Sequence, residues 1–416
     1  PQQIFGMNTL YARSCKAIVV TLFFLLSGLS SEIAAQDKAP EPAKPEKKWY
    51  ETIQLRGYVQ FRYNRLLETN DKLKCEQCDR SWGENGGFFL RRARLVFSGN
   101  LSKNVYFYIQ PDFATNASSN NQHFGQIRDA YFDIGFDEHN EFRLRLGQSK
   151  VPFGFDNLQS SQNRLAFDRS DPINSAVANE RDLGAFFYYA PKSKRELFSK
   201  LVKDGLKGSG DYGIFAFGVY NGQTANRPEI NNEPHVVARI SYPFYIGSQI
   251  VEPGLQAFKG IYTLGSDQIS NGVNFYSDKR YVDERAAFSF VLYPQPLGIQ
   301  MEYNVGRGAK YDPTTDSIVN ADLKGGYILI SYRYNVGSRT LFPFIRYQTY
   351  SGGKKHELDA RNYDISEFNI GTDLQLSKNL ELTAEYVVSS RRFEDHGIRN
   401  NLQKGNLLRL QAQINF

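Results

Sequence analysis

The chain has 416 residues, 14% of them aromatic, and a mean hydropathy of -0.49. This polar average excludes a bundle of membrane helices, whereas a transmembrane β-barrel keeps such an average because half of each strand faces water. The net charge of +6 is spread over 50 basic and 44 acidic residues with no basic block, so we expect no nucleic-acid partner.

The N-terminal segment has the pattern of a secretory signal. Basic residues precede the apolar run 17–26, and a small-residue pair that ends at Ala35 follows it, which predicts cleavage after Ala35. The run is shorter than the ~20 residues of a spanning helix, which disfavours the alternative of a membrane anchor. We assign residues 1–35 to the signal peptide and interpret residues 1–6 as an over-extended start.

Residues 36–48 are rich in Pro, Lys and Glu, which predicts a disordered periplasmic leader before a barrel domain at 49–416. Cys75 and Cys78 follow this leader and are predicted to form a local disulfide. A zinc site would need about two more ligands, and a free pair is a further alternative. We predict no metal and no cofactor.

The body of the chain reads as a ladder of about sixteen strands. Segments of eight or more residues alternate in polarity between turn residues, at 52–63, 88–98, 104–113, 126–136, 141–150, 182–190, 211–221, 234–244, 254–264, 285–293, 297–306, 323–335, 339–350, 364–376, 380–390 and 405–416. In the last of them, Leu410 and Ile414 share a face with the terminal Phe416, opposite Arg409 and Gln411. The pattern predicts an all-β fold, a transmembrane antiparallel β-barrel closed by its first and last strands. A soluble β-sandwich is the alternative.

The connections favour the membrane barrel over the sandwich. Short turns lie at 98–104, 137–140, 294–296, 335–338 and 377–379. They alternate with long polar connections at 64–87, 114–125, 151–181, 222–233, 265–284, 307–322, 351–363 and 391–404. Outer-membrane barrels have this asymmetry of short periplasmic turns and long outer loops. The connection 191–210 breaks the pattern because it is long on the short side.

The third outer loop, 151–181, contains several apolar residues that would be poorly placed in water. We expect it to fold into the lumen and to narrow the channel. The charged residues that it would bring to the constriction are Lys150, Asp156, Arg164, Asp168 and Arg169. An external flap is the alternative.

A barrel of this size leaves an aqueous channel, lined by the strand face opposite the apolar one. The basic residues of that face are Arg56, Arg62, Arg92, Arg94, Arg143, Arg145, Arg239, Arg333, Arg346 and Arg409. Its acidic residues are Asp112, Asp129, Asp133, Glu302, Asp373, Glu381 and Glu385. The cationic excess predicts mild anion selectivity. In the alternative, these arginines pair with the carboxylates and stiffen the wall.

Three ordered blocks resemble the phosphate-selective porin O and P family of Gram-negative outer membranes. They are RRARLVFSGNL at 91–101, YFYIQPDF at 106–113 and GQSKVPFG at 147–154. The resemblance is clearest over about 53–182. It implies a sixteen-stranded homotrimeric porin of the outer membrane, with an inward-folded third loop and an arginine ladder that guides anions to a lysine-rich constriction.

The loop 158–169 is similar to the loop of that family but departs from it at one position. Phosphate-specific members have a lysine after the paired serines, and here Gln162 stands there, with Arg164 two residues on. The resemblance therefore supports the fold and the pore but not strict phosphate specificity.

The sequence thus predicts an outer-membrane porin for small anionic or neutral solutes, seated in lipid, and not an enzyme. A barrel hydrolase is disfavoured because none of the five histidines accompanies a Gly-x-Ser-x-Gly elbow. An energy-coupled receptor would need roughly 22 strands and a folded plug. A structural or adhesive barrel that does not conduct is the other alternative.

Overall fold

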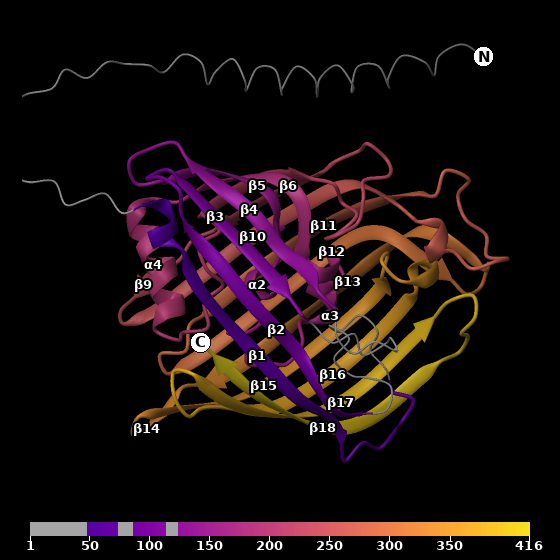
Figure 1. The fold of residues 1–416 in the computed structure, drawn as a ribbon. Helices are drawn as coiled ribbons and strands as arrows, with labels where there is room; N and C mark the ends of the chain where they lie inside the picture. Colours follow the sequence, from indigo (N-terminus) through magenta and orange to yellow (C-terminus); the bar gives the residue numbers. More distant parts are fainter. Residues whose placement is uncertain (1–47, 74–85, 114–123) are drawn as a thin grey trace, which may run out of the picture. The chain divides into compact units, whose positions relative to one another are not determined.

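The computed structural model describes residues 48–73, 86–113 and 124–416 (Figure 1). The predicted signal, nearly all of the leader, and Cys75 and Cys78 lie outside the described residues. From Lys48 onward the chain forms one compact unit. No helix in the described part is both long and apolar enough to span a bilayer.

The unit is a closed antiparallel barrel of sixteen staves, as predicted. After a turn of 3-10 helix, η1 (Trp49–Thr52), the strands are β1 (Gln54–Leu66), β2 (Gly87–Asn100), β3 (Val105–Asp112), β4 (Gln126–Gly135), β5 (Phe142–Lys150), β6 (Arg181–Tyr189), β7 (Phe215–Tyr220), β8 (His235–Ser241), β9 (Phe244–Ile246), β10 (Gln249–Thr263), β11 (Arg280–Leu292), β12 (Leu297–Asp312), β13 (Ser317–Tyr332), β14 (Tyr334–Val336), β15 (Arg339–Gly353), β16 (Asn362–Gln375), β17 (Leu380–Glu394) and β18 (Leu402–Asn415). β8 and β9 both pair with β10, and β13 and β14 both pair with β15. Each of these two pairs is one interrupted stave, so eighteen strands form sixteen staves.

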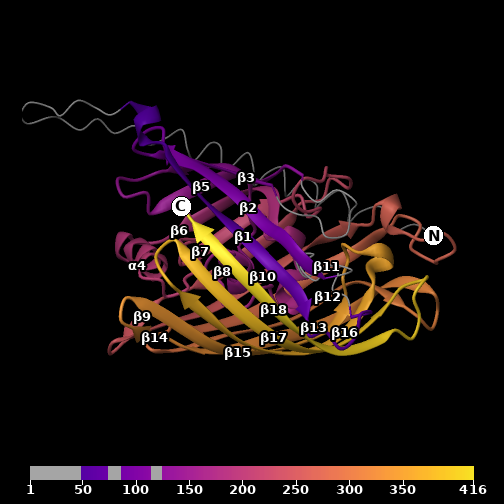
Figure 2. The same cartoon turned by 60° about the horizontal axis from the view of Figure 1, so that its bottom comes forward.

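The barrel closes between its first and last strands, which lie side by side in Figures 1 and 2. Phe416 completes the ladder, because the backbone N–H of Gly57 donates to Phe416 O at 2.8 Å and Phe416 N–H donates to Gly57 O at 3.0 Å. The Phe416 ring lies over Gly57, where a Cβ would stand 2.7 Å from the ring Cζ. A side chain at position 57 would therefore displace the ring at the closing seam.

Each predicted strand overlaps one stave, and the differences lie at the ends. The predicted loop 307–322 is mostly hairpin, because β12 runs on to Asp312 and β13 begins at Ser317. Beyond the membrane both faces of a strand meet water, so polarity stops alternating while the hydrogen-bonded ladder continues. The long connection 191–210 contains a helix, α4 (Lys192–Lys203).

The two faces of the staves differ as the alternation predicts. One face is exposed and apolar, with members on staves all round the barrel such as Leu55, Phe61, Ile109, Phe288, Ile345, Phe368 and Leu410. The other face is polar and buried within the unit. An apolar outer wall and a polar lumen are what a barrel in lipid requires.

Candidate functional site

The connection from β5 to β6, residues 151–180, is the centre of the candidate site and is called here the loop. It contains the short helices α2 (Phe155–Leu158) and α3 (Asp171–Asn174) and the turn η2 (Ala178–Glu180). Ser170 N–H donates to Asp156 Oδ2 at 2.7 Å, and Arg169 donates to the carbonyls of Asp156 and Gln159, each at 3.1 Å. Arg169 also pairs with Glu180 at 2.7 Å. These bonds tie α2, α3 and η2 into one folded segment.

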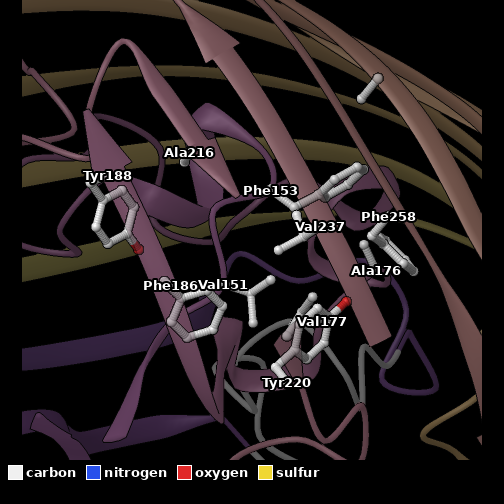
Figure 3. Close-up of a cluster of buried hydrophobic side chains, with 11 residues drawn as sticks. Val151, Phe153, Ala176, Val177, Phe186, Tyr188, Ala216, Tyr220, Val237 and Phe258 are labelled. Carbon is white, nitrogen blue, oxygen red and sulfur yellow. The ribbon is translucent and has the colours of Figure 1, made fainter. Parts of the chain in front are cut away.

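The apolar residues of the loop are buried against one side of the barrel. Val151 and Phe153 share a cluster with Phe186 of β6, Tyr220 of β7 and Phe258 of β10. Figure 3 shows these side chains gathered between the loop and the strands. These strand residues are buried while their chain neighbours are partly or fully exposed, so they belong to the inward face of the staves. Burial of this apolar surface holds the loop against β6, β7 and β10.

On the other side, the loop is held by ionic contacts to Asp168. Its carboxylate pairs with Arg62 of β1 at 3.4 Å and with Arg409 of β18, and all three side chains are buried. Arg346 of β15 donates to the Asp168 carbonyl at 2.6 Å. The guanidinium carbons of Arg62 and Arg409 lie 4.5 and 5.1 Å from the centre of the Phe167 ring. Three staves thus converge on two residues of the loop.

A second set of ionic contacts surrounds α3. Asp171 accepts from Lys354 Nζ at 2.5 Å and from Arg391 of β17 at 2.8 Å. Arg285 of β11 donates to the carbonyl of Pro172 at 3.0 Å. In the order of staves, β11 stands on the far side of the barrel from β1 and β18. The loop therefore contacts staves on opposite sides of the barrel.

The paired serines of the loop lie beside β1 and β2. Ser161 Oγ is 2.7 Å from the hydroxyl of Tyr58 and accepts from Arg94 at 3.0 Å. The carbonyl of Gln162 accepts from Gln413 at 3.1 Å. Gln162 therefore contacts β18 through its backbone carbonyl, and its side chain carries no positive charge.

Lys150 and Arg164 both direct donors at backbone carbonyls of the loop. Lys150 Nζ donates to Leu158 O at 2.7 Å and to Gln159 O at 3.0 Å. Arg164 donates to Phe167 O at 3.1 Å. Lys150, at the end of β5, and Arg164 thus both bond the loop itself, and the role of these residues in a constriction stays a prediction.

Seven of the ten predicted lumen arginines pair with carboxylates, and these seven are Arg62, Arg94, Arg143, Arg145, Arg239, Arg346 and Arg409. Arg92 donates to Gln60 at 2.8 Å. Arg333 is half-buried at the break between β13 and β14. Arg56 is exposed and has no ion pair or hydrogen bond within the described residues. Most of these arginines thus pair with carboxylates, as in the alternative in which such pairs stiffen the barrel wall.

Several cations that hold the loop were absent from the predicted set, among them Arg128, Arg181, Arg285, Lys354 and Arg391. Arg391 follows the predicted strand 380–390 by one residue, and Lys354 lies in the predicted loop 351–363. Arg285 begins a segment with apolar residues on both faces, so alternation alone could not orient it. The exposure of Phe288 and the burial of Ser289 place Arg285 on the buried face.

The end of the barrel with the short turns is covered in part by α4. Phe198 and Leu201 are buried in one cluster with Phe155 of the loop. Beyond the helix, Lys207 pairs with Asp373 of β16 at 3.1 Å. The apolar spacing at positions 197, 198 and 201 is the sequence signal for this amphipathic helix.

A cavity of about 240 Å³, called here the tyrosine cavity, lies between the loop, the staves β1–β6 and residues 209–212. Its lining has four tyrosines, five cationic side chains and two carboxylates. The cations are Arg56, Arg94, Arg145, Lys150 and Arg181, and the carboxylates are those of Asp129 and Asp211. Arg94, Arg145 and Arg181 are each paired with a carboxylate, which leaves Arg56 and Lys150 as the lining cations without an ion pair within the described residues.

Comparisons with known proteins agree with this geometry. A profile of the family described as phosphate-selective porin O and P matches residues 70–416. No curated protein sequence matches the chain. Among solved structures, the outer-membrane channel DcaP of Acinetobacter baumannii is similar, with a TM-score of 0.52, 14% identity, and coverage of 88% of this chain and 97% of that one.

Two other solved structures share the fold. OmpF of Salmonella typhi, in a complex with daunomycin, has a TM-score of 0.54 and 13% identity over 88% of this chain and 97% of its own. OmpT of Vibrio cholerae, described in a trimer form, has a TM-score of 0.51 and 10% identity over 88% of this chain and 99% of its own.

The family match covers most of the chain, and the fold is that of outer-membrane channels. A closed barrel with an apolar outer wall spans the outer membrane of a Gram-negative bacterium, and its polar lumen is a path for diffusion. The chain belongs to the phosphate-selective porin O and P family, as a diffusion channel of the outer membrane.

Proposed function

We propose that the channel passes small anionic and neutral solutes with a mild preference for anions, and that the loop sets its narrowest point. The observation that carries the proposal is the lining of the tyrosine cavity, where the cations Arg56 and Lys150 have no ion pair within the described residues while both lining carboxylates are paired. A cationic lining lowers the barrier for anions and raises it for cations. The contacts of the loop with β1, β11, β15 and β18 support its place across the lumen.

Pairing of most arginines is the reason that the expected preference is mild. A guanidinium that already binds a carboxylate contributes little net charge to a passing ion. Arg56, whose side chain has no ion pair within the described residues, is the proposed anion contact, with Arg92 and Arg94 on the adjacent strand β2.

Strict phosphate specificity is not proposed. Gln162 offers no positive charge, and Arg164 donates to a carbonyl of the loop itself. Dehydrating a phosphate needs several strong donors or cations at one point. We expect phosphate to permeate no faster than other anions of similar charge, and to block the channel no more strongly than they do.

We also propose that the protein is a homotrimer, by analogy with the family. Analytical ultracentrifugation of the folded protein in detergent tests this, and a single monomeric species would contradict it.

The selectivity is tested by recording the reversal potential of the purified protein in a planar bilayer under a KCl gradient. We expect an anion-favouring potential, and a fall of at least about twofold in the chloride-to-potassium permeability ratio for Arg92→Ala with Arg94→Ala. Arg307→Ala, which removes one positive charge from an exposed side chain on the outward face of β12, is the control for a change of charge outside the lumen. A wild-type potential that favours cations would overturn the proposal.

A further inference from the structure

The tyrosine cavity contains an ordered stack of rings and guanidinium groups. The rings of Tyr108 and Tyr131, which face each other on β3 and β4, are 5.1 Å apart and nearly parallel at 10°. Arg145 covers the outer face of this pair, with its guanidinium carbon 3.8 Å from the centre of the Tyr131 ring. At the other end, the guanidinium of Arg56 lies 5.9 Å from the Tyr108 ring. Planar guanidinium groups and aromatic rings attract one another in this way.

The two ends of the stack differ in their charge partners. Arg145 forms a two-pronged pair with Asp133, at 2.7 and 2.9 Å. Arg56 has no such carboxylate among the described residues, and it is exposed to the cavity that it lines. A guanidinium with open donors at one end of an aromatic wall is arranged to receive an anion.

The remaining lining adds a polar group without a partner and a further ring. The hydroxyl of Ser209 is buried with no hydrogen-bond partner among the described residues, and Ser209 lines the cavity. Tyr212 also lines the cavity, with its ring centre 5.7 Å from the guanidinium carbon of Arg145. Buried hydroxyl groups are normally hydrogen-bonded, so an unpartnered one that lines a cavity points to a ligand.

We propose that the tyrosine cavity is a binding subsite for a small aromatic carboxylate. The carboxylate binds the open donors of Arg56, and the flat ring packs among the tyrosine side chains. The proposal rests on the proposed function and names a solute class for it. An inorganic anion would use only the charge of Arg56 and would make no use of the rings of Tyr106 and Tyr212, which line the cavity outside the stack, and a neutral ring would leave Arg56 unpaired.

The size of the cavity fits one ring and not a large solute. Ligand pockets usually run from about 300 to 1,000 Å³, and this cavity of about 240 Å³ lies just below that range. The lining sets a graded order of affinity, because charge and ring contribute separately. Benzoate should bind better than cyclohexanecarboxylate, which keeps the charge and loses the flat ring, and acetate and inorganic phosphate should bind weakest.

The test is isothermal titration calorimetry of the full folded barrel in detergent with these four probes, which needs no conduction. Arg56→Gln should weaken benzoate binding about tenfold or more, the loss expected for a hydrogen-bonded charge. Arg307→Gln is the control of equal charge change, and it should leave binding unchanged. Tyr212→Leu should abolish the preference for benzoate over cyclohexanecarboxylate while acetate binding stays the same.

The outcomes separate this proposal from the proposed function. Equal binding of benzoate and acetate, or benzoate binding that survives Arg56→Gln, would overturn the subsite even if the channel is anion-selective. Selective benzoate binding by a barrel that conducts no ions would support the subsite and overturn the diffusion of anions.

Discussion

Asp168→Asn should change both the charge and the mobility of the constriction. In the cluster around Asp168, its carboxylate pairs with Arg62 and Arg409, Arg409 also pairs with Glu385, and Arg346 and Arg391 share Glu367. The variant removes one negative charge from this cluster and so makes it more positive by one unit. At about 4 Å in water, a unit charge contributes about 1 kcal/mol, which corresponds to about a fivefold local enrichment of chloride.

The same substitution weakens the hold on the loop. Removing one partner of a buried ion pair costs about 3–5 kcal/mol because the other charge stays buried and unpaired. The apolar cluster at Val151 and Phe153 keeps the base of the loop in place, so we expect a folded barrel with a more mobile loop. Open-channel current noise should rise, and the loop should become more sensitive to protease.

The assay is single-channel recording under a KCl gradient, with the reversal potential, conductance and noise measured for each protein. Asp322→Asn is the matched control, because it removes the same charge from a side chain that is 95% exposed at the outer end of β13. We expect Asp168→Asn to shift the reversal potential toward chloride and the control to leave it unchanged. An identical reversal potential, conductance and noise in wild type and Asp168→Asn would show that Asp168 does not hold the loop beside the ion path.

Three further predictions concern the ends of the barrel. Phe198→Ala removes a buried ring of α4 and should cost about 3–5 kcal/mol locally; conductance should rise, and an unchanged conductance would place α4 outside the path. Gly57→Val should displace the Phe416 ring at the closing seam and lower the yield of heat-modifiable folded barrel on electrophoresis, whereas a normal yield would show that the seam tolerates a side chain. Burial would raise the pKa of Asp137, but three backbone N–H donors outweigh it and hold the pKa below its usual range. The carboxylate therefore stabilises the β4–β5 turn above the unfolded pKa and loses that effect as pH falls, so the thermal midpoint of Asp137→Asn should fall less than that of wild type between about pH 5 and pH 3.

The staves could be predicted because alternation reports a strong local constraint. Within the bilayer, every second side chain must be apolar, as in β18, where Leu410 is exposed and Arg409 is buried. The same rule placed Arg62, Arg94 and Arg409 on the polar face. It could not reveal that Arg62 and Arg409 share Asp168, because a period of two identifies a face and not the neighbour across the lumen.

Other elements fall outside that constraint. Arg391 and Lys354 lie where strands leave the membrane and polarity no longer alternates, so their contacts with Asp171 had no sequence signature. The connection 191–210, which leads to β7, is too long for a periplasmic turn because it contains an amphipathic helix, as the apolar spacing around Phe198 indicates. An amphipathic helix there packs on the loop, a contact that depends on the closed barrel.

The central claim, that the loop narrows a conducting lumen, is tested most directly by single-channel conductance after residues 159–169 are replaced with a short Gly-Ser linker. Heat-modifiable mobility and circular dichroism must first show that the shortened protein is a folded barrel. We expect the shortened barrel to have a larger conductance and a weaker anion preference than wild type, because it lacks the constriction and its charges. A folded, shortened barrel with the wild-type conductance and reversal potential would contradict it.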